Sequence, residues 1–446
     1  MRALLPLLTA LLVLLSGCRR PVGQAEPFPE DFVWGAGNAA FQEVTLTEAH
    51  VQALRAVGLT HYRLSLDWAA LLPDGENLNT NEADRVAAEL ALLNDAGVEP
   101  LVVLYQGDMP ARFLDEGGWA SAESPVWFEH YARQAFDAFG DAVSMWVTMA
   151  DPFRDRLNAH RLPVEPDTTL RPVSAAAPPF VQARRAARAQ NPEQSTRALL
   201  ATRLTEMHHM LQAHARAKAA GAQAPIGLIV GAAPVHPADP ENDGPAADLE
   251  DQYRNGFLLG GLYEGAYPSD LLEALALDLD APETEADFLG IDYFAPVRVE
   301  ADSLSEHMGV RLIPNLDGDK SAFGEADARS LHAILTQVAD RYDNPPVYVT
   351  GNGAAYGPID ELNAAGRIRD ELRVRFLRRH LVRAQLAAAD GVDLRGFFVW
   401  SAFDAAGPPV SGIIAIDSVS GQPVFKDSAR YLRSIAAANA VSRMPF

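Results

Sequence analysis

Residues 82–105 read EADRVAAELALLNDAGVEPLVVLY, and this stretch decides the fold class. Its first half, 82–95, has an amphipathic helical pattern that stops before Gly97, a residue typical of helix C-termini. Its second half, 100–105, is continuously apolar, which is typical of a strand buried on both faces of a parallel sheet. A helix followed directly by such a strand indicates a β/α fold.

The same alternation extends along the 446-residue chain. Strands are expected at 32–36, 61–66, 100–105, 144–149, 226–230, 288–293, 347–350 and 396–400. Helices are expected at 49–57, 82–95, 125–139, 199–220, 330–341, 369–389 and 429–438. Eight strands alternating with helices predict an α/β protein with a single (β/α)8 TIM barrel. Three longer segments, 154–195, 232–250 and 295–328, are predicted to be irregular loops on that barrel.

Composition narrows the functional class. Apolar residues make up 48% of the chain, enough for a large core, and the net charge is -22. A nucleic-acid partner would require a basic footprint, so none is expected. Neither a metal nor an organic cofactor is predicted. The histidines of the helix at 199–220 lack the spacing of ligands on one helix face, and a packing role is expected for His208, His209 and His214.

The N-terminus has the features of an export signal. Arg2 precedes an apolar run over 3–15, which is too short to span a bilayer and is typical of a signal peptide. The run ends in LSGC at 15–18, which resembles the lipobox of bacterial lipoproteins, and Cys18 is the only cysteine in the chain. We expect a lipoprotein signal at 1–18 with lipidation of Cys18, a tether at 19–27 and the barrel at 28–446. The membrane would then be a partner through this anchor, on the periplasmic or extracellular face of the bacterial cell envelope. The alternative is an ordinary secretory signal with a chance cysteine.

Short motifs on the expected strands carry a family resemblance. They include FPEDFVWGA at 28–36, YRLSLDW at 62–68, DFLGIDY at 287–293, YVTGNG at 348–353 and GFFVWS at 396–401. In this order they resemble glycoside hydrolase family 1, the β-glucosidase family of (β/α)8 barrels. The resemblance covers residues 28–435.

The resemblance implies a retaining glycosidase site with two carboxyl groups about 5 to 5.5 Å apart. The family nucleophile is the glutamate of a Thr-Glu-Asn-Gly motif, but residues 350–353 read TGNG, with Gly351 at that position. Because glycine has no side chain, no covalent intermediate can form there. The family acid/base is the glutamate of Asn-Glu-Pro, and residues 150–152 read ADP. Asp151 keeps a carboxyl group that is one methylene shorter, and a misplacement of about 1 Å can cost roughly 100-fold in rate.

The sugar-binding positions of the family are also changed. The resemblance assigns them to Gln42, Arg63, Gln106, Phe294 and Trp400. Gln42 and Trp400 are kept sugar contacts, and Arg63 normally supports the nucleophile. Phe294 replaces a tyrosine whose hydroxyl supports the nucleophile, and Gln106 replaces a histidine. Further family residues of the catalytic face are replaced at Gly107, Ala150, Gly407 and Pro408.

These losses favour a β-glycosidase-like lipoprotein that is a non-catalytic pseudoenzyme. It would bind a carbohydrate or an unidentified protein partner through the altered barrel mouth. The alternative is an O-glycosyl hydrolase of the β-glucosidase type, or a transglycosidase, that acts through Asp151 by a changed mechanism. An external nucleophile or another aspartate near a strand end would then replace the glutamate, and the candidates are Asp67, Asp108, Asp292 and Asp404. Asp108 and Asp404 are also structural residues of the family. A purely structural envelope protein is the third possibility.

Overall fold

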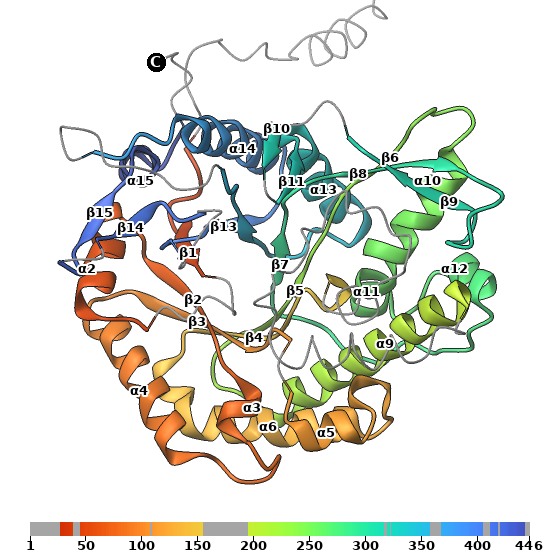
Figure 1. Cartoon of the computed structure of the whole chain (residues 1–446), viewed down its shortest axis with the longest axis horizontal. Coiled ribbons are helices and arrows are strands. Elements are labelled where there is room, and N and C mark those ends of the chain that lie inside the picture. Colours follow the sequence, from red (N-terminus) through yellow and green to blue (C-terminus); the bar gives the residue numbers. More distant parts are fainter. Residues whose placement is uncertain are drawn as a thin grey trace, which may run out of the picture.

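The computed structural model describes residues 27–38, 45–107, 109–154, 195–315, 319–321, 323–356, 367–404, 411–417 and 420–441. Its centre is a closed barrel of eight parallel strands in the order β1-β13-β12-β7-β5-β4-β3-β2 (Figure 1). These strands are β1 (Val33–Gly37), β2 (His61–Ser65), β3 (Glu99–Tyr105), β4 (Met145–Ala150), β5 (Ile226–Val230), β7 (Leu289–Asp292), β12 (Val347–Asn352) and β13 (Leu394–Trp400). The predicted single (β/α)8 TIM barrel is confirmed, and every predicted strand is present with ends that shift by a few residues. Cys18 and Gln42 lie outside the described residues.

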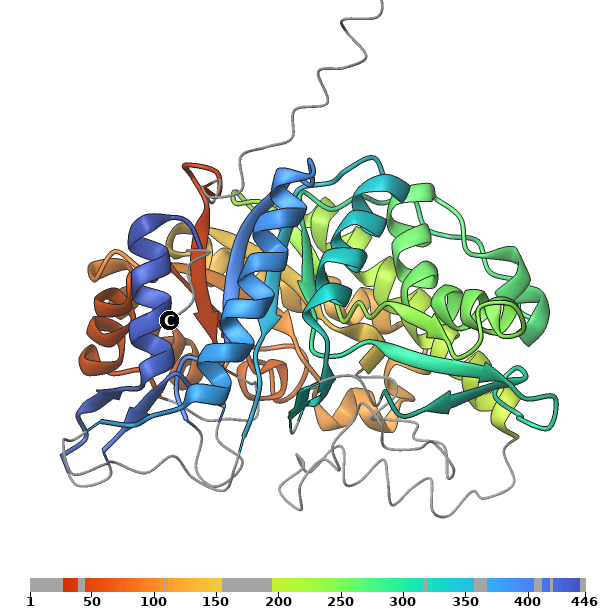
Figure 2. The same ribbon diagram turned by 90° about the horizontal axis from the view of Figure 1, so that it is seen from above.

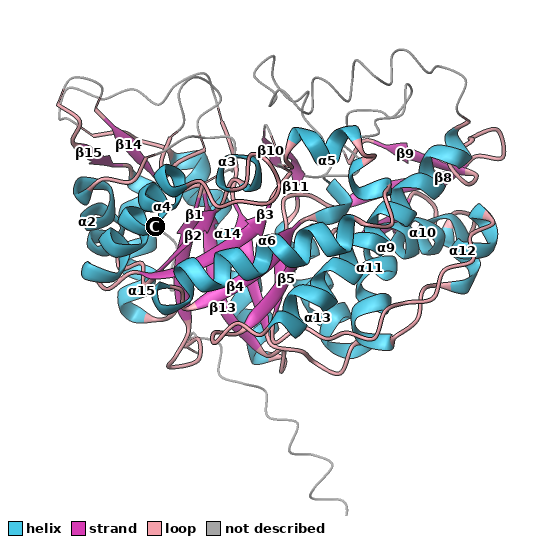
Figure 3. Cartoon of the chain, turned by 90° about the horizontal axis from the view of Figure 1, so that it is seen from below, coloured by secondary structure: helices cyan, strands magenta, loops and turns pink. Residues whose placement is uncertain are grey.

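Helices surround the barrel, as the perpendicular views show (Figures 2 and 3). The longer ones are α2 (Glu48–Val57), α4 (Thr80–Asp95), α6 (Ser124–Phe139), α9 (Thr196–Ala220), α13 (Ala328–Arg341), α14 (Glu371–Ala389) and α15 (Asp427–Ala438). Shorter ones are α3 (Trp68–Leu71), α5 (Ala111–Asp115), α10 (Gly244–Asp251), α11 (Phe257–Leu259) and α12 (Ser269–Leu275). In the described ranges, none of the helices has the length and apolarity that crossing a membrane requires.

Two of the three predicted loops contain regular structure, so that prediction is wrong for 232–250 and 295–328. They supply β6 (Val235–Pro237), β8 (Val297–Ala301) and β9 (Val310–Ile313), which form a separate three-stranded sheet. They also supply α10 and the hairpin of β10 (Asp319–Ser321) and β11 (Gly324–Ala326). The missed signal is the alternation along β8, where Val297 and Val299 are buried and Arg298 is half-buried. Of the third predicted loop, 155–194 lies outside the described residues.

One buried histidine joins the helical layer to the barrel. The hydroxyl of Thr148 on β4 donates to Nδ1 of His214 on α9 at 2.8 Å, and Nε2 of His214 donates to the carbonyl of Glu285 at 3.1 Å. His214 is fully buried, and burial lowers the pKa of its imidazole from 6.5 to about 4. His214 therefore has the packing role that its sequence position predicts.

This histidine should make stability depend on pH. An unfolded His214 takes up a proton near pH 6.5, whereas the native one stays neutral down to about pH 4. Because the unfolded state binds more protons in this window, stability falls as pH decreases from 6.5 to 4, by roughly 3 kcal/mol. His214→Gln is expected to flatten the dependence of the urea-derived unfolding free energy on pH. His130→Gln on the exposed face of α6 is the control, and an unchanged slope in the His214 variant would contradict the assignment.

Candidate active site

The C-terminal ends of four barrel strands converge on one buried cluster. Arg63 comes from β2, Asp292 from β7, Gly351 from β12 and Trp400 from β13. In the sheet register Gly351 lies beside Asp292, and the Arg63 guanidinium lies 4.6 Å from the ring centroid of Trp400. Catalytic residues of (β/α)8 enzymes lie at this end of the barrel, so the cluster is the candidate active site.

Arg63 and Asp292 form a buried ion pair at the centre of this cluster. Nη1 of Arg63 donates to Oδ1 and Oδ2 of Asp292 at 2.9 and 3.0 Å. The Thr350 hydroxyl donates to Oδ1 of Asp292 at 2.7 Å. The Arg63 side chain is 0% exposed and that of Asp292 is 7% exposed. Nε and Nη2 of Arg63 are also buried and have no hydrogen-bond partner among the described residues.

The carboxyl group of Asp292 occupies the space beside Gly351. A Cβ atom built on Gly351 would lie 2.7 Å from Oδ1 of Asp292 and 2.9 Å from its Cγ. Those separations are shorter than any ordinary contact of a Cβ atom. A side chain at position 351 would therefore collide with Asp292, and the carboxylate facing Arg63 is supplied by β7 instead of β12.

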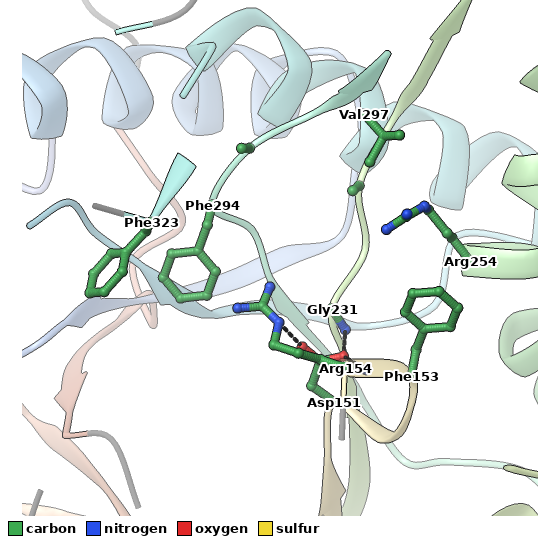
Figure 4. A pocket seen from close by; sticks show the side chains of 10 residues that line it. Asp151, Phe153, Arg154, Gly231, Arg254, Phe294, Val297 and Phe323 are labelled. Atoms are coloured by element: carbon green, nitrogen blue, oxygen red, sulfur yellow. Dashed lines mark hydrogen bonds and ion pairs between the residues drawn. The ribbon is translucent and has the colours of Figure 1, made fainter. Parts of the chain in front are cut away.

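Asp151 follows β4 and is held by three donors (Figure 4). Its Oδ1 accepts from the backbone N–H groups of Arg154 at 3.1 Å and Gly231 at 3.2 Å. Its Oδ2 pairs with Nε of Arg154 at 2.8 Å. Any Cβ atom at Gly231 would overlap this carboxyl group. The backbone of Asp151 has a φ of 52°, a left-handed conformation that aspartate tolerates better than most residues.

The surroundings of Asp151 change its acidity. Burial raises the pKa of its carboxyl group, the charge of Arg154 opposes this rise, and the charge of Asp292 adds to it. Burial is thus the main cause of the raised pKa of Asp151, and the charge of Asp292 is a smaller one. A carboxyl group with a raised pKa is the kind that donates a proton in general acid catalysis.

Aromatic and arginine side chains line a small cavity next to Asp151 (Figure 4). The Arg154 guanidinium lies 5.1 Å from the centroid of the Phe294 ring, and Phe294 packs edge-on against Phe323 at 5.4 Å. Arg254 lies over the ring of Phe153 on the opposite side. The cavity measures about 30 Å³, which is room for a water molecule or two. The structure thus places Phe294 and Asp151 on the same cavity.

The other predicted residues are dispersed or lie outside the described part. Gln106 accepts a hydrogen bond from the Ser65 hydroxyl at 2.7 Å. Asp67 caps α3 by accepting from the Ala70 N–H, and Asp404 pairs with Lys426 at 2.7 Å, so both are structural. Of the predicted aspartates that the structure describes, Asp151 and Asp292 remain as candidates at the barrel mouth. Not described are Gln42, Asp108, Gly407 and Pro408.

Sequence reasoning missed Arg154 entirely. This residue forms the ion pair that restrains Asp151 and stacks on Phe294. The available signal was the spacing of three residues between an aspartate and an arginine, which brings such side chains together on one helical turn. That spacing is common on protein surfaces and does not by itself indicate a functional pair.

Comparisons of the sequence and of the structure with known proteins point to the same family. The profile of Glycosyl hydrolase family 1 matches residues 45–441. Beta-glucosidase A of Thermotoga maritima is 27% identical over 92% of this chain and 98% of its own length. Beta-glucosidase A of Enterobacter agglomerans is 28% identical over 85% of this chain and 87% of its own. The solved family 1 β-glucosidase from T. maritima superimposes with a TM-score of 0.79 at 24% identity, over 94% of this chain and all of that one. Its complex with castanospermine gives 0.76 at 26%, over 93% and 99% of the two chains.

Proposed function

The chain belongs to glycosyl hydrolase family 1, and from this premise we propose that it binds a carbohydrate at the barrel mouth without hydrolysing it. The observation that carries the proposal is that the two carboxylates described at the mouth are paired with arginines, Asp151 with Arg154 and Asp292 with Arg63. A retaining glycosidase needs one carboxylate to attack the sugar and a second carboxyl group to protonate the leaving group. With the lipid anchor expected at Cys18, binding would take place at the bacterial cell envelope.

The geometry argues against ordinary turnover. Gly351 supplies no nucleophile, and both oxygens of Asp292 accept from Nη1 of Arg63. Asp151 is restrained by three donors on a left-handed backbone. Loss of a catalytic nucleophile costs about 10⁶ in kcat in a well-measured protease, so hydrolysis by the family route should be undetectable.

Features of the same cluster support binding. Trp400 and Arg63 are retained, and Nε and Nη2 of Arg63 have no partner among the described residues. Buried donors are normally satisfied, but the Arg63 side chain is 0% exposed, so a sugar hydroxyl group would reach them only after neighbouring side chains move. The T. maritima relative has been solved with castanospermine and with deoxynojirimycin. On that basis we propose that this chain also binds a carbohydrate-like ligand.

The test measures binding and turnover in the same samples. The purified protein is titrated with cellobiose and with nitrophenyl β-glycosides while the heat of binding, the melting temperature and product are recorded. We expect a saturable signal and a higher melting temperature, because a ligand of the native state stabilises it, with no product. Trp400→Phe should weaken binding. Trp127→Phe is the matched control, since Trp127 stacks on Phe113 in the outer layer.

Two outcomes would contradict the proposal. Turnover at the rate of an ordinary family member would show that the site is catalytic. The absence of any binding signal across the panel would favour the purely structural envelope protein.

The raised pKa of Asp151 beside the charge of Asp292 favours one second candidate. In this candidate Asp151 is the acid and Asp292 replaces the family nucleophile in a slow O-glycosyl hydrolase or transglycosidase. The same assay tests it with Asp151→Asn. Product formed by the wild type and lost in this variant would support it, whereas a variant no slower than the wild type would exclude Asp151 as the acid.

A further inference from the structure

Two arginines line the small cavity beside Asp151 at the barrel mouth (Figure 4). Arg154 follows β4, and Arg254 comes from the π-helical turn Gln252–Gly256. Apart from these arginines and Asp151, the cavity is lined by glycine, alanine, valine and phenylalanine residues. We propose that this cavity binds the carboxylate group of an acidic sugar, a uronic acid, and that the two arginines select it. This inference rests on the proposed function, because it names the class of carbohydrate that the mouth would bind.

The first argument is that both guanidinium groups keep donors for a ligand. Arg254 pairs with Glu250 and Arg154 pairs with Asp151, and in both pairs the contacting atom of the arginine is Nε. Within the described residues, no hydrogen bond engages the Nη nitrogens of these two arginines, and they are not sealed from solvent. Such a fork can donate two parallel hydrogen bonds to one carboxylate. The argument depends on these donors and not on an excess of positive charge.

The second argument is that the Arg254 side chain is held in place before any ligand binds. Its guanidinium lies 5.3 Å from the centroid of the Phe153 ring, and its partner Glu250 is buried. Glu250 also accepts from Nε2 of His307 at 2.7 Å, so the carboxylate that orients Arg254 is itself fixed. A side chain that is already ordered loses little entropy when it binds a ligand. Turns of π-helix are also frequent at functional sites.

The third argument is the size of the cavity. Its volume of about 30 Å³ is room for a water molecule or two, so it can take a carboxylate group but not a sugar ring. The ring would stay outside this cavity, at the barrel mouth. A hydroxymethyl group would also fit, but it is uncharged and cannot accept two parallel hydrogen bonds from one guanidinium as a carboxylate does.

The carboxyl group of Asp151 lines the same cavity, and its charge would oppose a second carboxylate. That charge is offset by the backbone N–H groups of Arg154 and Gly231 and by the Arg154 guanidinium. Burial also raises the pKa of the Asp151 carboxyl group, and a second negative charge beside it would raise this pKa further. Asp151 can therefore take up a proton when an anionic group enters.

The test compares two probes that differ at one carbon of the sugar. The para-nitrophenyl β-glucuronide carries a carboxylate there, and the para-nitrophenyl β-glucoside carries a hydroxymethyl group. In calorimetric titrations of the full protein, we expect the glucuronide to bind at least about tenfold more tightly. This preference should shrink as sodium chloride is raised. Arg154→Gln should remove most of it, because the fork is lost.

The matched control is Arg341→Gln. Arg341 pairs through Nε with Glu264 and lies 5.2 Å from the centroid of the Tyr342 ring. It is 38% exposed, as against 37% for Arg154, but it does not line the cavity. This variant should keep the full preference for the glucuronide.

Arg254→Lys is the second variant. The lysine keeps a positive charge for Glu250 but has no fork of donors, so the preference for the glucuronide should fall while the protein stays folded. Circular dichroism and the melting temperature verify the fold of each variant.

The outcomes separate this inference from the proposed function. If the wild type binds neither probe, both are overturned. If it binds the glucoside as tightly as the glucuronide, or more tightly, only the preference for an acidic sugar is overturned. A preference that persists in both Arg154→Gln and Arg254→Lys, or that falls equally in Arg341→Gln, would overturn the assignment to this cavity.

Discussion

Asp292→Asn is expected to lower the free energy of unfolding by about 3 kcal/mol, at the lower end of what removing one partner of a buried ion pair costs. The reason is that Arg63 is 0% exposed and would lose its counter-ion without gaining access to water. The asparagine can still accept a hydrogen bond, but it carries no charge. Urea denaturation of wild type and variant, monitored by tryptophan fluorescence, measures the difference.

The matched control is Asp393→Asn. Asp393 also accepts two hydrogen bonds from an arginine, at 2.9 and 2.8 Å from Arg395, but this pair is 50% and 35% exposed. An exposed pair contributes no more than about 1 kcal/mol, so this variant should be nearly as stable as the wild type. If both variants lose the same unfolding free energy, the buried pair of Arg63 and Asp292 contributes no more to stability than an exposed pair.

Gly351→Glu is expected to destabilise the protein rather than simply restore a missing nucleophile. The new Cβ atom would lie 2.7 Å from Oδ1 of Asp292, and overpacking of this kind costs about 1 to 3 kcal/mol. The new carboxylate would also lie beside the existing one and compete with it for Arg63. The variant should therefore have a lower melting temperature than the wild type.

In a protein that already carries Asp292→Ala, Gly351→Glu is expected to raise the stability instead of lowering it. Asp292→Ala alone leaves Arg63 unpaired in the core, at a cost of about 3 to 5 kcal/mol. In the double variant the alanine makes room for the introduced glutamate, and that glutamate supplies the negative charge that Arg63 lost. We expect the double variant to be more stable than the sum of the two single changes predicts, by at least about 2 kcal/mol.

The neutral counterpart isolates the contribution of charge. Gly351→Gln in the Asp292→Ala background introduces a side chain of nearly the same size as glutamate but without charge, and it should not restore stability. If glutamate and glutamine behave alike, or if the two single effects add, then Asp292 does not occupy the place of a side chain at position 351. The catalytic candidate can be examined in the same double variant with the glycoside assay.

Much of this fold could be predicted from local patterns. Continuous apolar runs and helical stretches that stop at glycine give strand and helix positions to within a few residues, because each barrel unit repeats the same burial. The three-stranded sheet of β6, β8 and β9 was not predicted. Strands β8 and β9 pair with each other locally, but β6 comes from a segment that the barrel strand β7 separates from them. The pairing of β6 with β8 therefore depends on contacts that no local pattern encodes.

The candidate site divides in the same way. The sequence alone determined that position 351 has no carboxyl group and that position 151 keeps a shortened one, because these are properties of single residues within motifs. Only the tertiary structure decided that Asp292 faces Arg63 and lies in the space beside Gly351. That arrangement joins residues 229 positions apart in the chain and depends on the register of β7 against β12. A shift of one residue in a strand turns its side chains to the opposite face, so the register of a closed barrel selects which carboxylate reaches the arginine.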